Sequence, residues 1–215
     1  MSVNLRDLPL LGQGLLAQGD DWQVHLVRPG EPLFTAILDG RQAVSCGPVT
    51  DAIDGHSTHY ALTQGGTLQV WFRVTRAHQG PLDCEGTYPP ELVEAFRPVL
   101  ASTSRLGRPP GPGRNHLVIL AMRCGWAHQL NQGAEVDLIN ARVTLAPLYT
   151  RLQYPALPGW SFMHPRTGVT HDVRALAPAC DIRGSWGDVF ADRPVARAAP
   201  HRARLAAAGR LVGAR

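Results

Sequence analysis

Residues 59–76, HYALTQGGTLQVWFRVTR, carry the clearest secondary-structure pattern in the chain. Beyond the Gly65-Gly66 pair, apolar residues recur at every second position from Leu68 to Val74. Such a period of two beside a glycine turn is typical of a β-hairpin, because glycine tolerates the positive φ that tight turns require. The sequence therefore predicts two antiparallel strands, with an aliphatic stripe in the core and Trp71 and Arg73 on an opposite, mixed surface.

Shorter alternating runs before this hairpin, at residues 22–27, 33–38 and 41–46, predict three more strands. The last two are separated by Asp39-Gly40, a dipeptide typical of two-residue hairpin turns. Closely spaced antiparallel strands of this kind are typical of a sandwich or barrel. The predicted fold class is therefore mainly β (α+β), an antiparallel β-sandwich or barrel with one or two short helices and extended termini.

The second half of the chain is less regular. Prolines at 89 and 90 predict the start of a helix over residues 89–101. Residues 116–122, HLVILAM, are apolar on both faces and predict a buried strand, while residues 134–149 fit either a strand or a helix, with their β-branched content favouring a strand.

These patterns divide the chain into five parts. They are an N-terminal arm (1–21), an antiparallel β domain (22–101), an Arg/Pro/Gly loop (102–114), a second β-containing portion (115–190) and a basic tail (191–215).

Composition narrows the class of protein. Of the 215 residues, 44% are hydrophobic and 18% are charged, a balance that favours a globular chain over a disordered one. No apolar run approaches the roughly 18 residues of a membrane span, and no signal peptide is evident, so we expect a cytoplasmic protein, or part of a particle assembled there, without a membrane partner. The four cysteines form no CxxC pair, which favours buried thiols over a zinc knuckle and leaves two disulfides as an alternative.

Charge is distributed unevenly along the chain. All 21 basic residues are arginine. Residues 1–94 hold five arginines against eleven acidic residues, a net −6, whereas residues 95–215 hold sixteen against six, a net +10. Arginine-only usage is expected from a GC-rich coding sequence, but the asymmetry indicates a polyanionic partner or head-to-tail packing in an assembly.

Arginine clusters supply the candidate binding residues, because guanidinium groups bind phosphate bidentately and stack on bases. The candidates are Arg73, Arg76, Arg105, Arg108, Arg114, Arg193, Arg197, Arg202, Arg204 and Arg210. With no nucleotide-binding or hydrolase motif present, they predict a non-enzymatic structural or binding subunit of a nucleoprotein or virion-like assembly. It would need no cofactor and would dock onto RNA, DNA or an acidic protein surface, including other copies of itself.

An enzymatic alternative centres on Cys124-Gly125-Trp126, which is similar to the nucleophile region of papain-like and transglutaminase-like folds. That resemblance implies a Cys/His hydrolase or transferase with Cys124 as nucleophile, His164 or His171 as base and Asp172 or Asp181 as its orienting partner. The competing interpretation is a buried structural thiol.

A metal site is a further alternative. His56 and His59 lie close in sequence to Asp51 and Asp54, and imidazole and carboxylate groups suit zinc, manganese or iron. The competing interpretation is a polar loop that leads into a strand.

Overall fold

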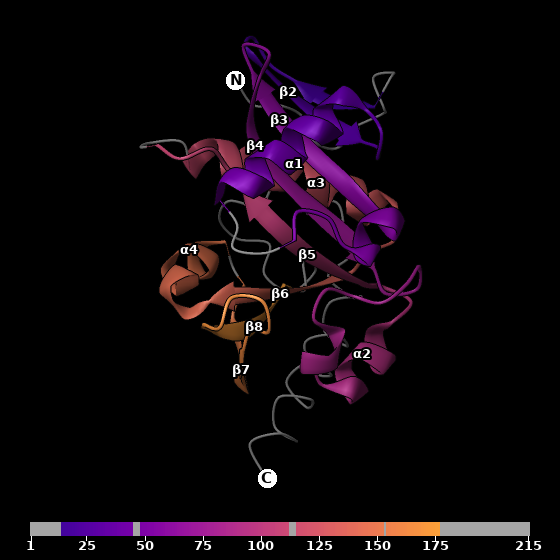
Figure 1. The fold of residues 1–215 in the computed structure, drawn as a ribbon. Coiled ribbons are helices and arrows are strands. Elements are labelled where there is room, and N and C mark those ends of the chain that lie inside the picture. Colours follow the sequence, from indigo (N-terminus) through magenta and orange to yellow (C-terminus); the bar gives the residue numbers. More distant parts are fainter. Residues whose placement is uncertain (1–13, 45–47, 112–114, 153, 177–215) are drawn as a thin grey trace. The chain divides into compact units, whose positions relative to one another are not determined.

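The computed structural model describes residues 14–44, 48–111, 115–152 and 154–176 (Figure 1). The chain forms two compact units, one from Met1–Thr75 and Thr103–Gln132, the other from Arg76–Ser102 and Gly133–Arg215. Strand β5 (Leu100–Gly107) therefore contributes its first three residues to the second unit and the rest to the first.

The first unit contains four strands that pair antiparallel in sequence order. They are β1 (Leu15–Gln18), β2 (Trp22–Val27), β3 (Ser57–Gln64) and β4 (Thr67–Arg76). The predicted hairpin is confirmed: β3 pairs with β4 with Tyr60 opposite Phe72. Gly65 and Gly66 form its turn at φ values of 54° and 77°, the left-handed region that the glycines were expected to supply.

The mixed surface predicted for this hairpin is wrong, because helices cover both faces of the strands. On one face, a Cβ on Gly40 of α1 (Pro32–Val44) would lie 2.8 Å from the Trp71 ring. On the other, a Cβ on Gly125 of α3 (Asn115–Asn131) would lie 2.5 Å from the Phe72 ring. Trp71 and Arg73 are consequently 1% and 0% exposed.

The strands predicted at residues 33–38 and 41–46 are also wrong, since one helix, α1, runs from Pro32 to Val44. Its buried residues Phe34, Ile37 and Arg41 recur every three to four positions, which is the helical period. Asp39-Gly40 lies within the helix and is not a turn. Residues 45–46 lie outside the described residues.

The buried strand predicted at 116–122 belongs instead to α3. Two apolar faces are equally typical of a buried helix, and length decides between the two, since α3 has 17 residues. The predicted helix 89–101 is shorter than expected. As α2 (Pro90–Phe96), it ends before Pro98, whose ring cannot continue a helix. The predicted loop 102–114 is strand as far as Gly107.

The second unit contains β6 (Val136–Arg142), β7 (Ala156–Met163) and β8 (Thr170–Leu176), in the order β5-β6-β8-β7. β5 and β6 are parallel from Leu100–Val136 to Ser102–Leu138, and the other pairs are antiparallel. The sheet is therefore mixed and open, and the predicted antiparallel sandwich or barrel is wrong. Residues 134–149 supply both alternatives, strand β6 and then η4 (Val143–Leu145) and the start of α4 (Ala146–Arg151).

The core of this unit is apolar. It joins α2 and the loop before it to β5, β6 and β8 through Leu82, Tyr88, Leu92, Val93, Phe96, Leu100, Val136, Leu138, Val173 and Ala175. No helix in the described part of the chain is long and apolar enough to cross a membrane.

Candidate functional site

A buried cluster of charged side chains lies in the first unit. It is organised by η2 (Ala52–His56), whose N-cap Asp51 accepts a hydrogen bond from the Ile53 amide. Asp54, three residues after the cap, accepts one from the Asp51 amide. This reciprocal capping box fixes both carboxylates beside one another at the start of β3.

Three arginines converge on these two carboxylates from separate elements. Arg73 of β4 donates to Asp51 and, over 2.8 Å, to Asp54, and its Nε donates to Ser104 of β5 over 2.9 Å. Arg105 binds Asp51 over 2.8 Å, and Arg41 of α1 binds both oxygens of Asp54 over 3.1 Å. We call Arg41, Asp51, Asp54, Arg73 and Arg105 the charged cluster.

The charged cluster holds three positive and two negative groups. Burial by itself would raise the pKa of Asp51 and of Asp54, but the neighbouring guanidinium groups hold both pKa values below their ordinary value. Both carboxylates are thus ionised at neutral pH, and one positive charge remains. Among the described residues, three buried donors, Arg41 Nε, Arg41 Nη2 and Arg105 Nε, find no hydrogen-bond partner.

The metal alternative involved the same segment. Asp51 and Asp54 turn their carboxylates toward guanidinium groups, and His59 Nε2 lies 3.0 Å from the backbone oxygen of Asp54. That oxygen only accepts, so Nε2 carries the ring proton, while burial lowers the pKa of His59 and keeps the ring neutral. Within the described residues, no group of three or more His, Cys, Asp or Glu side chains is arranged to hold a metal ion.

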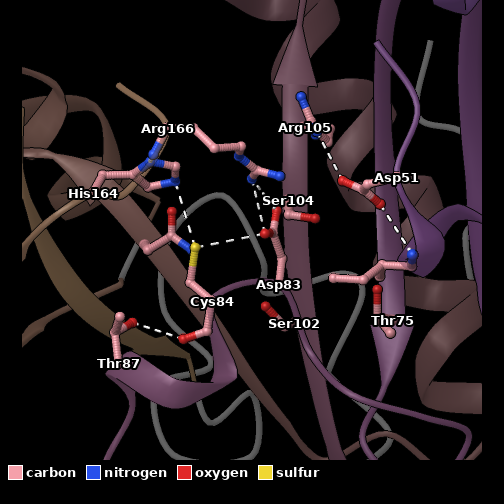
Figure 2. A network of polar contacts seen from close by, with 12 residues as sticks. Asp51, Thr75, Asp83, Cys84, Thr87, Ser102, Ser104, Arg105, His164 and Arg166 are labelled. Carbon is pink, nitrogen blue, oxygen red and sulfur yellow. Dashed lines mark hydrogen bonds and ion pairs between the residues drawn. The ribbon is translucent and has the colours of Figure 1, made fainter. Parts of the chain in front are cut away.

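A second polar cluster lies in the second unit, at the loop between β4 and α2 (Figure 2). The Cys84 sulfur lies 3.5 Å from His164 Nε2 and 3.6 Å from Asp83 Oδ1. Arg166 Nη2 donates to both oxygens of Asp83, over 2.8 and 2.9 Å. Cys84 is half-buried and has a φ of 59°, a left-handed conformation rare for a residue other than glycine.

The imidazole of His164 continues this cluster into the core. Its ring centroid lies 4.4 Å from that of His171, and His171 Nδ1 lies 3.3 Å from Asn140 Oδ1. Asn140 donates to the Tyr88 hydroxyl over 3.1 Å, and that hydroxyl lies 3.5 Å from Ser102 Oγ. Burial is the main cause that lowers the pKa of His171 to about 4, and the neighbouring His164 lowers it further.

The residues of the predicted thiol site belong to different units. Cys124 lies on α3 in the first unit, whereas His164, His171 and Asp172 belong to the second. Asp181 lies outside the described residues. The Cys124 side chain is 0% exposed, and burial raises the pKa of its thiol to about 12. This is the opposite of the shift that a nucleophilic cysteine needs.

The predicted binding arginines have varied surroundings. Arg73 and Arg105 belong to the charged cluster, and Arg76 is 4% exposed with Nη2 lying 3.4 Å from the Pro98 carbonyl oxygen. Arg108 donates to the Gly111 carbonyl over 2.6 Å. Arg114 and the tail arginines 193, 197, 202, 204 and 210 lie outside the described residues.

Sequence reasoning missed Cys84 and Arg41. Cys84 follows Asp83 in a loop with no motif, and its partner His164 is 80 positions away along the chain. Arg41 was assigned to the first position of the predicted strand 41–46. The available signal was the helical spacing of Phe34, Ile37 and Arg41, which places an arginine on the buried face of a helix and so requires an acidic partner.

No protein-family model and no curated protein sequence matches the chain. Solved structures are similar to it. The AHL synthase LasI superposes with a TM-score of 0.55 at 16% identity, covering 73% of this chain and 90% of LasI. BjaI, a CoA-dependent acyl-homoserine lactone synthase, superposes with a TM-score of 0.55 at 12% identity. The match covers 78% of this chain and 87% of BjaI. An acyl-CoA N-acyltransferase from Pseudomonas aeruginosa superposes with a TM-score of 0.51 at 18% identity. The match covers 73% of this chain and 99% of that protein.

At these identities the likeness establishes the fold. It overturns the prediction of a non-enzymatic assembly subunit that docks on nucleic acid or on an acidic surface, because the chain is folded like acyl-transferring enzymes.

Proposed function

We propose that this protein is an acyltransferase that moves an acyl group from an acyl-CoA thioester to an amine. The observation that carries the proposal is the fold that the chain shares with the acyl-CoA N-acyltransferase, over 99% of that protein, and with two lactone synthases. The amine nitrogen would attack the thioester carbonyl, the C–S bond would break, and CoA would leave as a thiol with the proton lost by the amine.

Coenzyme A presents phosphates, and the end of β5 offers a place for them. The 17-residue helix α3 begins at Asn115, where its first-turn amides give the positive end of the helix dipole. Arg108 lies between β5 and α3 and is partly exposed. We therefore keep Arg108 as the phosphate-binding candidate, with CoA in place of nucleic acid as the ligand, whereas Arg105 belongs to the charged cluster.

The charged cluster supports an acceptor that carries an anionic group. Its three guanidinium groups outnumber its two carboxylates, and no described residue accepts a hydrogen bond from Arg105 Nε. A carboxylate beside that edge would supply both a counter-charge and an acceptor. An α-amino acid derivative has such a carboxylate next to its amine. The structure of BjaI contains S-adenosylmethionine together with isopentyl-CoA, so S-adenosylmethionine is the first acceptor to test.

The test is release of CoA thiol, followed with a thiol-reactive dye, from a series of short, branched and long acyl-CoAs. Each acyl-CoA is supplied with S-adenosylmethionine or with one of a panel of amino acids and amines, and products are identified by mass spectrometry. We expect amine-dependent thiol release and an N-acyl product. The absence of both thiol release and CoA binding across the series would contradict the proposal.

A matched pair of variants tests the phosphate subsite. Arg108→Gln should raise KM for acyl-CoA by about tenfold with little change in kcat, because it removes binding shared by ground and transition states. Arg151→Gln, at an exposed arginine of α4, is the control and should leave KM unchanged. An acyl-N-acetylcysteamine thioester, which lacks the phosphates, should not distinguish the variants.

A further inference from the structure

The Cys84 cluster, defined as Asp83, Cys84, His164, Arg166 and His171, has no part in the phosphate and acceptor subsites described above. It combines a half-buried thiol, two imidazoles and a carboxylate in one unit. Figure 2 shows the thiol of Cys84 between the His164 ring and the Asp83 carboxylate. Its hydrogen-bond directions indicate what the thiol is arranged to do.

The tautomer of His164 follows from its neighbours. The Arg166 backbone N–H donates to His164 Nδ1 over 3.2 Å, so in the neutral ring Nδ1 holds a lone pair and Nε2 carries the proton. That N–H is directed at the Cys84 sulfur, 3.5 Å away. A donor in this position stabilises negative charge as it develops on sulfur.

The thiol proton has an acceptor on the opposite side. The Cys84 S–H donates to Asp83 Oδ1 over 3.6 Å, and Arg166 holds both oxygens of that carboxylate. Because the guanidinium offsets the charge of Asp83, the carboxylate can lie beside the sulfur without strongly opposing negative charge on it. A nucleophile, a proton acceptor and a stabilising donor are therefore within reach of one another.

His171 gives an independent indication of a ligand. It is 6% exposed, and its ring lies against His164. Asn140 donates through its Nδ2 to Tyr88, so its Oδ1 faces His171 and accepts from Nδ1–H. Nε2 is then a lone-pair acceptor, and it is buried with no hydrogen-bond partner in the part of the chain that the structure describes. A ligand that brings an N–H or O–H donor, as the pantetheine amides of an acyl thioester do, would satisfy it.

We propose that Cys84 is a covalent acyl-acceptor site that is acylated by an acyl thioester. The Cys84 sulfur attacks the thioester carbonyl, Asp83 takes the thiol proton, and the His164 N–H holds the sulfur during attack. The C–S bond of the donor breaks, and its thiolate recovers the proton from Asp83 and leaves as a thiol. One thioester is exchanged for another, so no oxidant or further reactant is needed. The choice of acyl donor rests on the proposed function.

The experiment incubates the full-length protein with an acyl-CoA, and separately with an acyl-N-acetylcysteamine thioester, without any amine. Intact mass and peptide mapping locate the acyl group, and neutral hydroxylamine should remove it. We expect one acyl group on Cys84, formed about tenfold faster or more than on Cys124, the buried internal control. Cys84→Ser should abolish this adduct. His164→Phe should slow its formation about tenfold, with partial recovery in His164→Gln, which restores a donor.

Acylation at other cysteines with Cys84 unmodified, or equal acylation of Cys84 and Cys124, would overturn this inference. If a stable Cys84→Ser variant still transfers acyl groups to amines and the wild type forms no adduct, the inference fails while the proposed function stands. If acyl-CoA is neither bound nor consumed but the N-acetylcysteamine thioester acylates Cys84, the proposed function fails while the thiol site stands.

Discussion

Arg73 and Asp54 form an ion pair in the interior of the first unit, with Arg73 Nη1 2.8 Å from Asp54 Oδ1 and the two residues 0% and 6% exposed. Arg73 also binds Asp51 and Ser104. Its guanidinium thus connects η2, β4 and β5, and its loss would leave buried charge without compensation.

Replacing this arginine tests how far the first unit depends on it. Arg73→Leu should lower the free energy of unfolding by about 3–5 kcal/mol, because Asp51 and Asp54 lose a shared partner in a buried site. Urea denaturation measures the change. The control is Arg97→Leu, at a partly exposed residue that pairs with Glu94 and Glu85. A loss for Arg97→Leu as large as that for Arg73→Leu would contradict this account.

The pH dependence of stability should reflect His171. Its folded-state pKa is lowered to about 4, below the ordinary value near 6.5. Between these two pKa values, His171 therefore binds a proton in the unfolded chain but not in the folded chain. Stability from the neutral ring is fully present above pH 6.5 and is lost as the pH falls toward 4. His171→Gln should make the free energy of unfolding fall less steeply as the pH falls through this window, and the slope should change by at most the equivalent of one bound proton.

Close packing of α3 on the sheet makes Gly125 sensitive to a single methyl group. A Cβ there would lie 2.5 Å from Phe72 Cζ. We expect Gly125→Ala to lower the free energy of unfolding by about 1–3 kcal/mol, despite the better helix propensity of alanine. In contrast, a Cβ on Gly55 meets no atom within 4 Å, so Gly55→Ala should be nearly neutral. Thermal unfolding of both variants measures the difference. Phe72→Leu should partly rescue Gly125→Ala, and failure to do so would point to another cause.

A pair of tyrosines tests a buried hydrogen bond in the second unit. Tyr154 donates to Asp137 Oδ2 over 2.7 Å, and both residues are 0% exposed. Tyr154→Phe should lower the free energy of unfolding by about 1–3 kcal/mol, because it removes the donor from a buried carboxyl oxygen. Tyr149 is also buried, but its hydroxyl makes no hydrogen bond within the described part of the chain. Tyr149→Phe should therefore change the denaturation midpoint little. Equal effects of the two changes would exclude the carboxylate bond as the cause.

The sequence was informative where local geometry decides the structure. The β3–β4 hairpin was predictable because a glycine turn and a period of two leave few alternatives. In contrast, α1 and α3 were mistaken for strands because short apolar runs fit either period. The helical spacing of the buried residues in α1 and the 17-residue length of α3 decide for helix. The parallel pairing of β5 with β6 joins segments about 35 positions apart, which no local pattern encodes.

The same distinction holds for the polar clusters. Asp51 and Asp54 were identified as a group because they are close in sequence. Their role was misjudged because the partners Arg41, Arg73 and Arg105 come from three other elements. Cys84 and His164 are brought together entirely by tertiary structure.

The course of the backbone also has a practical consequence. The chain leaves the first unit after Thr75, returns at Thr103 and leaves again after Gln132. A stop codon near the middle of the chain therefore removes part of both units. Neither unit is encoded by one continuous stretch of the gene. Reporter fusions and trimmed versions of this protein should be designed from its ends inward.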